Sequence, residues 1–181
     1  MQADDRGVQS VLPAALTDIH GVEQRPFEDE DATANVLVFT LQDCPIANSY
    51  VPTLNKLVDD YGSRGIRLVL VHVDPQLTID DARKHAQEFQ IKAPVVVDRK
   101  HDWVKFAGAT RSPEVVVFSP LGEVLYTGRI DDKYAALGKR RTHVSAHNLR
   151  DALDAILAGR PVPQPKTEAV GCFIPPLPLG D

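Results

Sequence analysis

The feature that most constrains the fold is the stretch from Asn35 to Tyr61, in which an apolar strand runs into a helix through Cys44. Residues Val36 to Phe39 are branched, aliphatic or aromatic, which is typical of a strand buried on both faces. Pro45 suits the first turn of a helix, where its fixed φ is favourable and its missing N–H is not needed. Apolar side chains then recur at helical spacing, at Leu54, Leu57, Val58 and Tyr61. The sequence therefore predicts that a helix leaves the sheet directly after Cys44.

A cysteine at such a corner has the surroundings of a nucleophile. A thiol at a helix N-terminus faces unpaired backbone N–H groups and the positive end of the helix dipole, and both stabilise the thiolate. We therefore expect Cys44 to titrate below the roughly 8.5 of a free thiol. A free cysteine can also be no more than a small buried hydrophobic residue. The corner position favours the reactive interpretation.

Composition excludes several classes of protein. A chain of 181 residues, 43% of them hydrophobic, is long enough for one domain with a full core. The net charge of −5 argues against nucleic acid or an anionic membrane as a partner. No apolar run approaches the roughly 18 residues that span a bilayer. The segment Met1 to Arg6 lacks the basic start and apolar stretch of a signal peptide, so we expect a cytoplasmic protein.

The chain divides into three parts. Residues 1–11 are expected to form a flexible N-terminal arm, residues 12–160 one folded domain, and residues 161–181 a proline-rich, extended C-terminal tail. The tail carries an apolar island at residues 169–174 that includes Cys172. A wholly disordered tail has little reason to hold such an island, so we expect it to dock. Two cysteines are too few for a disulfide scaffold and instead indicate reactive thiols.

The remaining pattern predicts an α/β sandwich, with a central mixed β-sheet and helices on both faces. The paired carboxylates Asp131 and Asp132 could bind a cation, but a solvated loop is the preferred interpretation. His72 lies within an apolar strand, so we expect a buried, hydrogen-bonded side chain, with a ligand or proton-relay role as the alternative. The expected elements are strands at Ile66–Val73, Pro94–Val97, Glu114–Phe118 and Glu123–Ile130, a helix at about Ile79–Phe89 capped by Thr78, a short helix around Trp103, and a final helix capped by Ser145.

Several of these motifs together resemble the thioredoxin superfamily. Cys44-Pro45-Ile46-Ala47 stands where that superfamily has its active site, and Pro52 matches the proline that kinks the following helix. Arg111-Ser112-Pro113 resembles the loop that places a cis-proline opposite the active cysteine. The likeness is to the redoxin branch, which includes the alkyl hydroperoxide reductase/thiol-specific antioxidant group and peroxiredoxin-like proteins, and it covers roughly residues 12–160.

The resemblance implies roles for individual residues. It implies a cis Ser112–Pro113 bond beside Cys44, and a substrate site formed by Pro45, Ser112 and Pro113. Arg111 is implied to stabilise the thiolate. Typical peroxiredoxins have Thr or Ser three residues before the cysteine, where this chain has Leu41, so Thr40 is the candidate for that hydroxyl. The chain also has Ala47 in place of the second cysteine of a dithiol motif.

The leading hypothesis is a peroxiredoxin-like, antioxidant thiol oxidoreductase that uses Cys44 as nucleophile. Its substrate would be a peroxide or a protein thiol or disulfide, its reductant an external thiol, and it would need no cofactor. Because Ala47 leaves no local partner, we predict that the tail folds back and brings Cys172 near Cys44, with Gly171 allowing a close approach of the backbone. The alternative is a tail that docks elsewhere or on a neighbouring subunit, with Cys172 incidental.

Two other classes of function stay open. One is a copper-binding, metallochaperone-like module in which Cys44, Cys172 and a histidine such as His72 supply the ligands. The other is an interaction domain that keeps the fold and has no catalytic activity.

Overall fold

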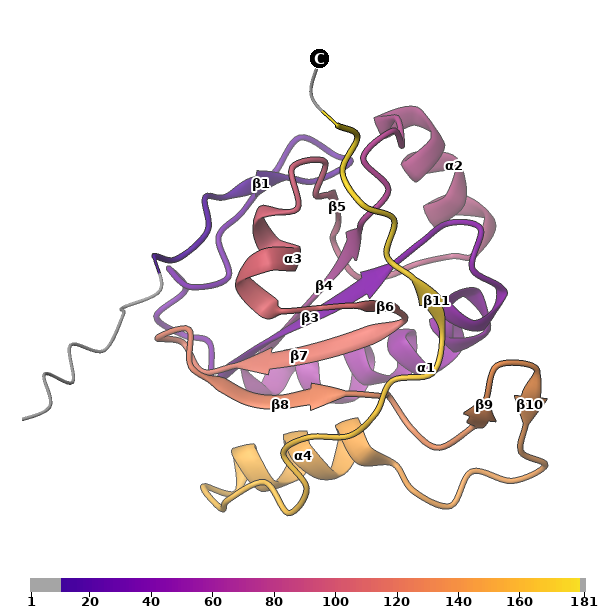
Figure 1. The fold of residues 1–181 in the computed structure, drawn as a ribbon. Helices are drawn as coiled ribbons and strands as arrows, with labels where there is room; N and C mark the ends of the chain where they lie inside the picture. Colours follow the sequence, from indigo (N-terminus) through magenta and orange to yellow (C-terminus); the bar gives the residue numbers. More distant parts are fainter. Residues whose placement is uncertain (1–10, 180–181) are drawn as a thin grey trace, which may run out of the picture.

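A five-stranded mixed sheet forms the centre of the computed structural model, which describes residues 11–179. The strand order is β5-β4-β3-β7-β8, with β3 parallel to β4 and antiparallel to β7 (Figure 1). The elements are β1 (Leu16–Thr17), β2 (Glu23–Gln24), β3 (Ala34–Thr40), α1 (Pro45–Tyr61), a 3-10 turn (Gly62–Arg64), β4 (Ile66–His72), α2 (Ile79–Glu88), β5 (Val95–Val97), α3 (Asp102–Ala107), β6 (Arg111–Ser112), β7 (Glu114–Phe118), β8 (Val124–Gly128), β9 (Tyr134–Ala136), β10 (Lys139–Arg140), α4 (Asn148–Leu157) and β11 (Cys172–Phe173).

The two faces of the sheet pack against different helices. Alternate residues of β3 point to opposite faces, so Val36 and Val38 join one core while Leu37 and Phe39 join the other. The first core contains the buried faces of α1, α2 and α4. The second core contains Trp103 of α3, which lies on the opposite side of the sheet (Figure 1). The predicted α/β sandwich, with helices on both faces of a mixed sheet, is confirmed.

The tail after α4 does not pack as a helix. It first runs beside the outer strand β8, where Lys166 forms a parallel bridge with Thr127. It then reaches β6 (Figure 1). There β11 pairs antiparallel with β6, so that Cys172 lies opposite Ser112 and Phe173 opposite Arg111. At the opposite edge of the sheet, Asp18 forms an antiparallel bridge with Val96 of β5. The predicted extended, docked tail is confirmed.

Most predicted elements are present, with corrections in the loops before α4. Asp131 and Asp132 are buried rather than solvated, because the hydroxyl of Tyr50 donates to Asp131 while the N–H and hydroxyl groups of Ser145 donate to Asp132. Ser145 therefore does not cap α4, whose N-cap is His147. The β9–β10 hairpin was not predicted. The expected flexible arm falls almost wholly outside the described residues. Among the helices within residues 11–179, none is long and apolar enough to cross a membrane.

Candidate active site

Cys44 lies at the corner between β3 and α1, as predicted. It is the N-cap residue of α1, and Pro45 occupies the first helical position. The side chain of Cys44 is only 1% exposed. Its sulfur lies 3.1 Å from the carbonyl oxygen of Ser112, which is within reach of a thiol proton. The Ser112 hydroxyl oxygen accepts a hydrogen bond from the N–H of Leu41 at 2.8 Å, which ties the cysteine loop to the proline loop. The predicted cis Ser112–Pro113 bond is confirmed.

The apolar island at residues 169–174, which we call the strap, covers this site. The strap pairs with β6, and the N–H of Ile174 donates to the carbonyl of Thr110 at 3.3 Å. Gly171 sits directly on the proline loop, where an added Cβ would lie 2.0 Å from the carbonyl oxygen of Ser112. Only glycine can pass so close to another backbone segment. Pro113 and Ser112, the predicted substrate-binding residues of this loop, are therefore buried beneath the strap.

The strap brings the two cysteines together. The sulfur of Cys172 lies 2.7 Å from the sulfur of Cys44, and both are free thiols. Burial is the largest influence on Cys44 and raises the pKa of its thiol. Hydrogen bonds from Cys172 and from the backbone of Ala47 and Cys172 act in the opposite direction, and the net pKa lies below its ordinary value. The lowering agrees in direction with the prediction for Cys44, but the hydrogen bond from Cys172 contributes more to it than the Ala47 N–H at the start of α1.

Cys172 has the opposite character. Burial, and then its hydrogen bond to Cys44, raises the pKa of the Cys172 thiol to about 11. Its side chain is partly exposed, in contrast to that of Cys44. The Cys172 thiol donates a hydrogen bond to the Cys44 sulfur, so of the two cysteines Cys44 is the one whose thiolate the pair stabilises.

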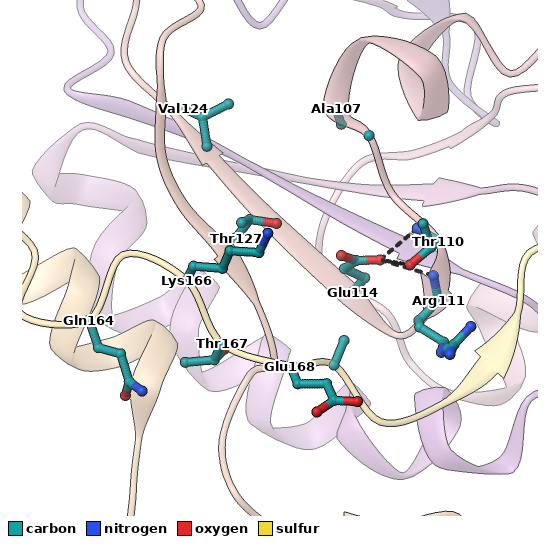
Figure 2. A pocket seen from close by; sticks show the side chains of 12 residues that line it. Ala107, Thr110, Arg111, Glu114, Val124, Thr127, Gln164, Lys166, Thr167 and Glu168 are labelled. Atoms are coloured by element: carbon teal, nitrogen blue, oxygen red, sulfur yellow. Dashed lines mark hydrogen bonds between the residues drawn. The ribbon is translucent and has the colours of Figure 1, made fainter.

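A carboxylate fixes the strand on which the strap docks. One oxygen of Glu114 accepts hydrogen bonds from the N–H groups of Thr110 and Arg111 and from the Thr110 hydroxyl (Figure 2). These residues line one wall of an open pocket of about 780 Å³. The opposite wall is the tail at residues 164–169, which passes along β8 before it reaches the strap (Figure 2).

Arg111 is engaged with the strap rather than with Cys44. Its guanidinium carbon lies 3.6 Å from the centroid of the Phe173 ring, because the β6–β11 register places these two residues opposite each other. The side chain of Arg111 is not among the main groups that shift the pKa of Cys44. Its predicted role in stabilising the thiolate is therefore not supported by a contact among the described residues.

Two hydrogen bonds of Asn48, one of them to His85 of α2, also hold the Cys44 loop. The side-chain amide of Asn48 donates to the carbonyl of Gln42 at 2.7 Å, and its oxygen lies 2.8 Å from Nε2 of His85. Because that oxygen can only accept, Nε2 of His85 must carry the proton. This pair was not predicted from the sequence. Its only signal is the position of Asn48, one helical turn after Cys44, on the same side of α1.

The structure corrects the expectation for His72. The side chain is fully buried, but neither ring nitrogen has a hydrogen-bond partner among residues 11–179. Burial, with a smaller effect of His85, lowers the pKa of His72 to about 3 and keeps it neutral. Its ring packs edge-on against His85, with centroids 4.9 Å apart. In the same part of the chain no three His, Cys, Asp or Glu side chains gather closely enough to bind a metal ion.

The other predicted residues lie around Cys44 without direct contacts to its sulfur. Thr40 is buried at the end of β3, and its carbonyl accepts from the N–H of Val73. No hydrogen bond joins its hydroxyl to Cys44 within residues 11–179. Pro45 is exposed at the start of α1, beside an open pocket that Asp43 also lines. The roles of these residues stay predictions.

Comparisons with known proteins place this geometry in context. The family model for redoxin matches residues 20–139. An uncharacterized conserved protein from Geobacillus kaustophilus is 28% identical, with a TM-score of 0.82 over 93% of this chain and 91% of that one. A hypothetical protein from Sinorhizobium meliloti 1021 is 24% identical, with a TM-score of 0.78 over 90% of each chain. A secreted disulfide oxidoreductase from Mycobacterium tuberculosis is 14% identical, with a TM-score of 0.56 over 81% of this chain and 96% of that one. The last two likenesses concern the fold alone. No curated protein matches the sequence.

Proposed function

Because the chain belongs to the redoxin family and is in general terms a thiol oxidoreductase, we propose that it reduces small hydroperoxides, with Cys44 as the nucleophile and Cys172 as the resolving thiol. The observation that carries the proposal is the 2.7 Å separation of the two sulfurs, held by the strap. The lowered pKa of Cys44 and the raised pKa of Cys172 support this division of roles, since the thiolate is the attacking species.

The reaction has two steps. The Cys44 thiolate attacks one oxygen of the hydroperoxide, the O–O bond breaks, and Cys44 becomes a sulfenic acid while the other oxygen takes a proton and leaves as alcohol or water. The Cys172 sulfur then attacks the sulfur of the sulfenic acid. A Cys44–Cys172 disulfide forms and water leaves. Two electrons pass from the thiol pair to the peroxide, and an external thiol must return them.

The strap favours a small oxidant over a protein disulfide. With the strap docked, Cys44 is 1% exposed, and the strand position beside Ser112 is already occupied by Cys172. A protein substrate would have to displace the strap before its disulfide could reach Cys44. A hydroperoxide of a few atoms needs a much smaller opening.

The test is the reaction of reduced protein with one equivalent of hydrogen peroxide, followed by non-reducing peptide mapping. The expected product is a cross-linked peptide with Cys44 and Cys172 within one chain. Cys172→Ser should instead accumulate sulfenic acid on Cys44, and Cys44→Ser should leave the peroxide unconsumed. A stable sulfenic acid in the unmodified protein would overturn the resolving role. Faster reaction with a disulfide-containing peptide than with peroxide would overturn the choice of substrate.

A further inference from the structure

The two sulfurs of the proposed disulfide would not be equally open to a reductant. Cys44 lies beneath the strap, enclosed by the carbonyl of Ser112 and the first turn of α1. Cys172 is partly exposed, because it belongs to the strap itself. Thiol–disulfide exchange requires direct contact between the attacking thiolate and one sulfur, so access alone favours Cys172.

Oxidation would keep Cys44 covered. The strap is already held by its pairing with β6, by the close seat of Gly171 and by the contact of Phe173 with Arg111. A covalent bond from Cys172 to Cys44 adds a further tether at the centre of this segment. Uncovering Cys44 would then require the strap to move while Cys172 stays bonded to the sulfur that the strap covers.

From this geometry we infer that the external thiol attacks Cys172, so that Cys172 rather than Cys44 forms the mixed disulfide with the reductant. This inference rests on the proposed function, which supplies the Cys44–Cys172 disulfide. The cysteine at the strand-to-helix corner then acts on the oxidant, and the strap cysteine serves as the entry point for electrons.

The leaving group supports the same direction. Attack on Cys172 releases the Cys44 thiolate at the start of α1, where the Ala47 N–H stabilises it. Attack on Cys44 would release the Cys172 thiolate, whose pKa is raised to about 11. A thiol of lower pKa leaves faster. Access and the leaving group therefore favour attack on the same sulfur, that of Cys172.

The exchange balances in two steps. An external thiolate forms a bond to the Cys172 sulfur, the Cys44–Cys172 bond breaks, and the Cys44 thiolate leaves. A second external thiolate attacks the sulfur of the bound reductant, which releases the external disulfide and the Cys172 thiolate, and the latter takes a proton. Two external thiols are oxidised, and the protein disulfide is reduced.

The experiment uses full-length protein oxidised with one equivalent of peroxide. It is mixed with a limiting amount of 2-mercaptoethanol, quenched with acid within seconds, and mapped by mass spectrometry without reduction. The expected result is a mercaptoethanol adduct on Cys172 at a level severalfold above that on Cys44. The same oxidised protein, unfolded in guanidinium chloride before mixing, is the control. There both sulfurs are equally exposed, so the preference should largely disappear.

The outcomes separate the two proposals. Adducts mainly on Cys44, or the same distribution in folded and unfolded protein, would overturn the inference and leave the proposed function standing. Failure to form the Cys44–Cys172 disulfide would overturn the proposed function, and the inference with it.

Discussion

Gly171→Ala is the sharpest single test of the strap. The added Cβ would lie 2.0 Å from the carbonyl oxygen of Ser112 and 2.5 Å from its carbonyl carbon, whereas real Cβ contacts stay beyond about 3.0 Å. Both neighbours are backbone atoms next to Pro113, so they cannot turn aside as a flexible side chain would. The strap must therefore move away from β6 by about 1 Å.

A shift of that size removes the strap's hydrogen bonds. The bond from the Ile174 N–H to Thr110 is already 3.3 Å long and would pass out of range. Losing two or three backbone hydrogen bonds, at about 1 kcal/mol each, favours the undocked strap by roughly 30- to 150-fold. We expect the alkylation of Cys44 to accelerate by a similar factor, since Cys44 becomes reachable only when the strap leaves.

The assay is the rate at which iodoacetamide modifies Cys44 in the reduced protein at pH 9, followed by peptide mass spectrometry. Gly62→Ala is the matched control, because a Cβ at Gly62 meets nothing within 4 Å and the residue has helical backbone angles. Circular dichroism checks that both variants stay folded. A Gly171→Ala rate within twofold of the unmodified protein would refute the reasoning, as would an equal acceleration in Gly62→Ala.

Three further predictions concern the same site. The alkylation rate of Cys44 should rise with pH and level off below the pH at which a free cysteine does, because its folded pKa is lowered; a profile that matches free cysteine contradicts this. His85→Ala should remove the donor to Asn48 and shift the pH profile of Cys44 alkylation. His85→Gln, whose amide can donate, should largely restore the profile of the unmodified protein. Equal profiles in the two variants would show that the hydrogen bond between His85 and Asn48 does not influence Cys44. Arg111→Ala should lose the contact with the Phe173 ring, worth about 0.5–1 kcal/mol, and raise the alkylation rate of Cys44 by iodoacetamide about two- to fivefold. Phe173→Ala should have the same effect. No change in either variant would show that this contact does not stabilise the docked strap.

The local parts of the site could be predicted from the sequence. The strand, the proline and the helical spacing around Cys44 lie within one continuous stretch, so their physics is visible without the fold. The docking of the strap was also predictable, because an apolar island in a proline-rich tail needs a surface to cover. Gly171 indicated a close backbone approach, and the structure gives it one.

The partners that come from distant segments could not be predicted. Arg111 was expected to approach Cys44 by resemblance, but the β6–β11 register decides its position and gives it Phe173 instead. The burial of Asp131 depends on Tyr50, which lies 81 residues earlier. Such pairs are set by packing, and no local pattern records them. His72 shows the same limit: its burial follows from its strand, but the absence of a hydrogen bond within residues 11–179 depends on what packs around it.

The tail also covers one edge of the central sheet. Outer strands of a sheet present unpaired N–H and C=O groups that can recruit another chain. Here each outer strand has a neighbour from near one end of the chain: Asp18 bridges to Val96 on β5, and Lys166 bridges to Thr127 on β8. Cutting off the tail to remove Cys172 would therefore also uncover β8 and invite self-association. Single substitutions within the strap change the chemistry of the tail and leave the bridge between Lys166 and Thr127 in place.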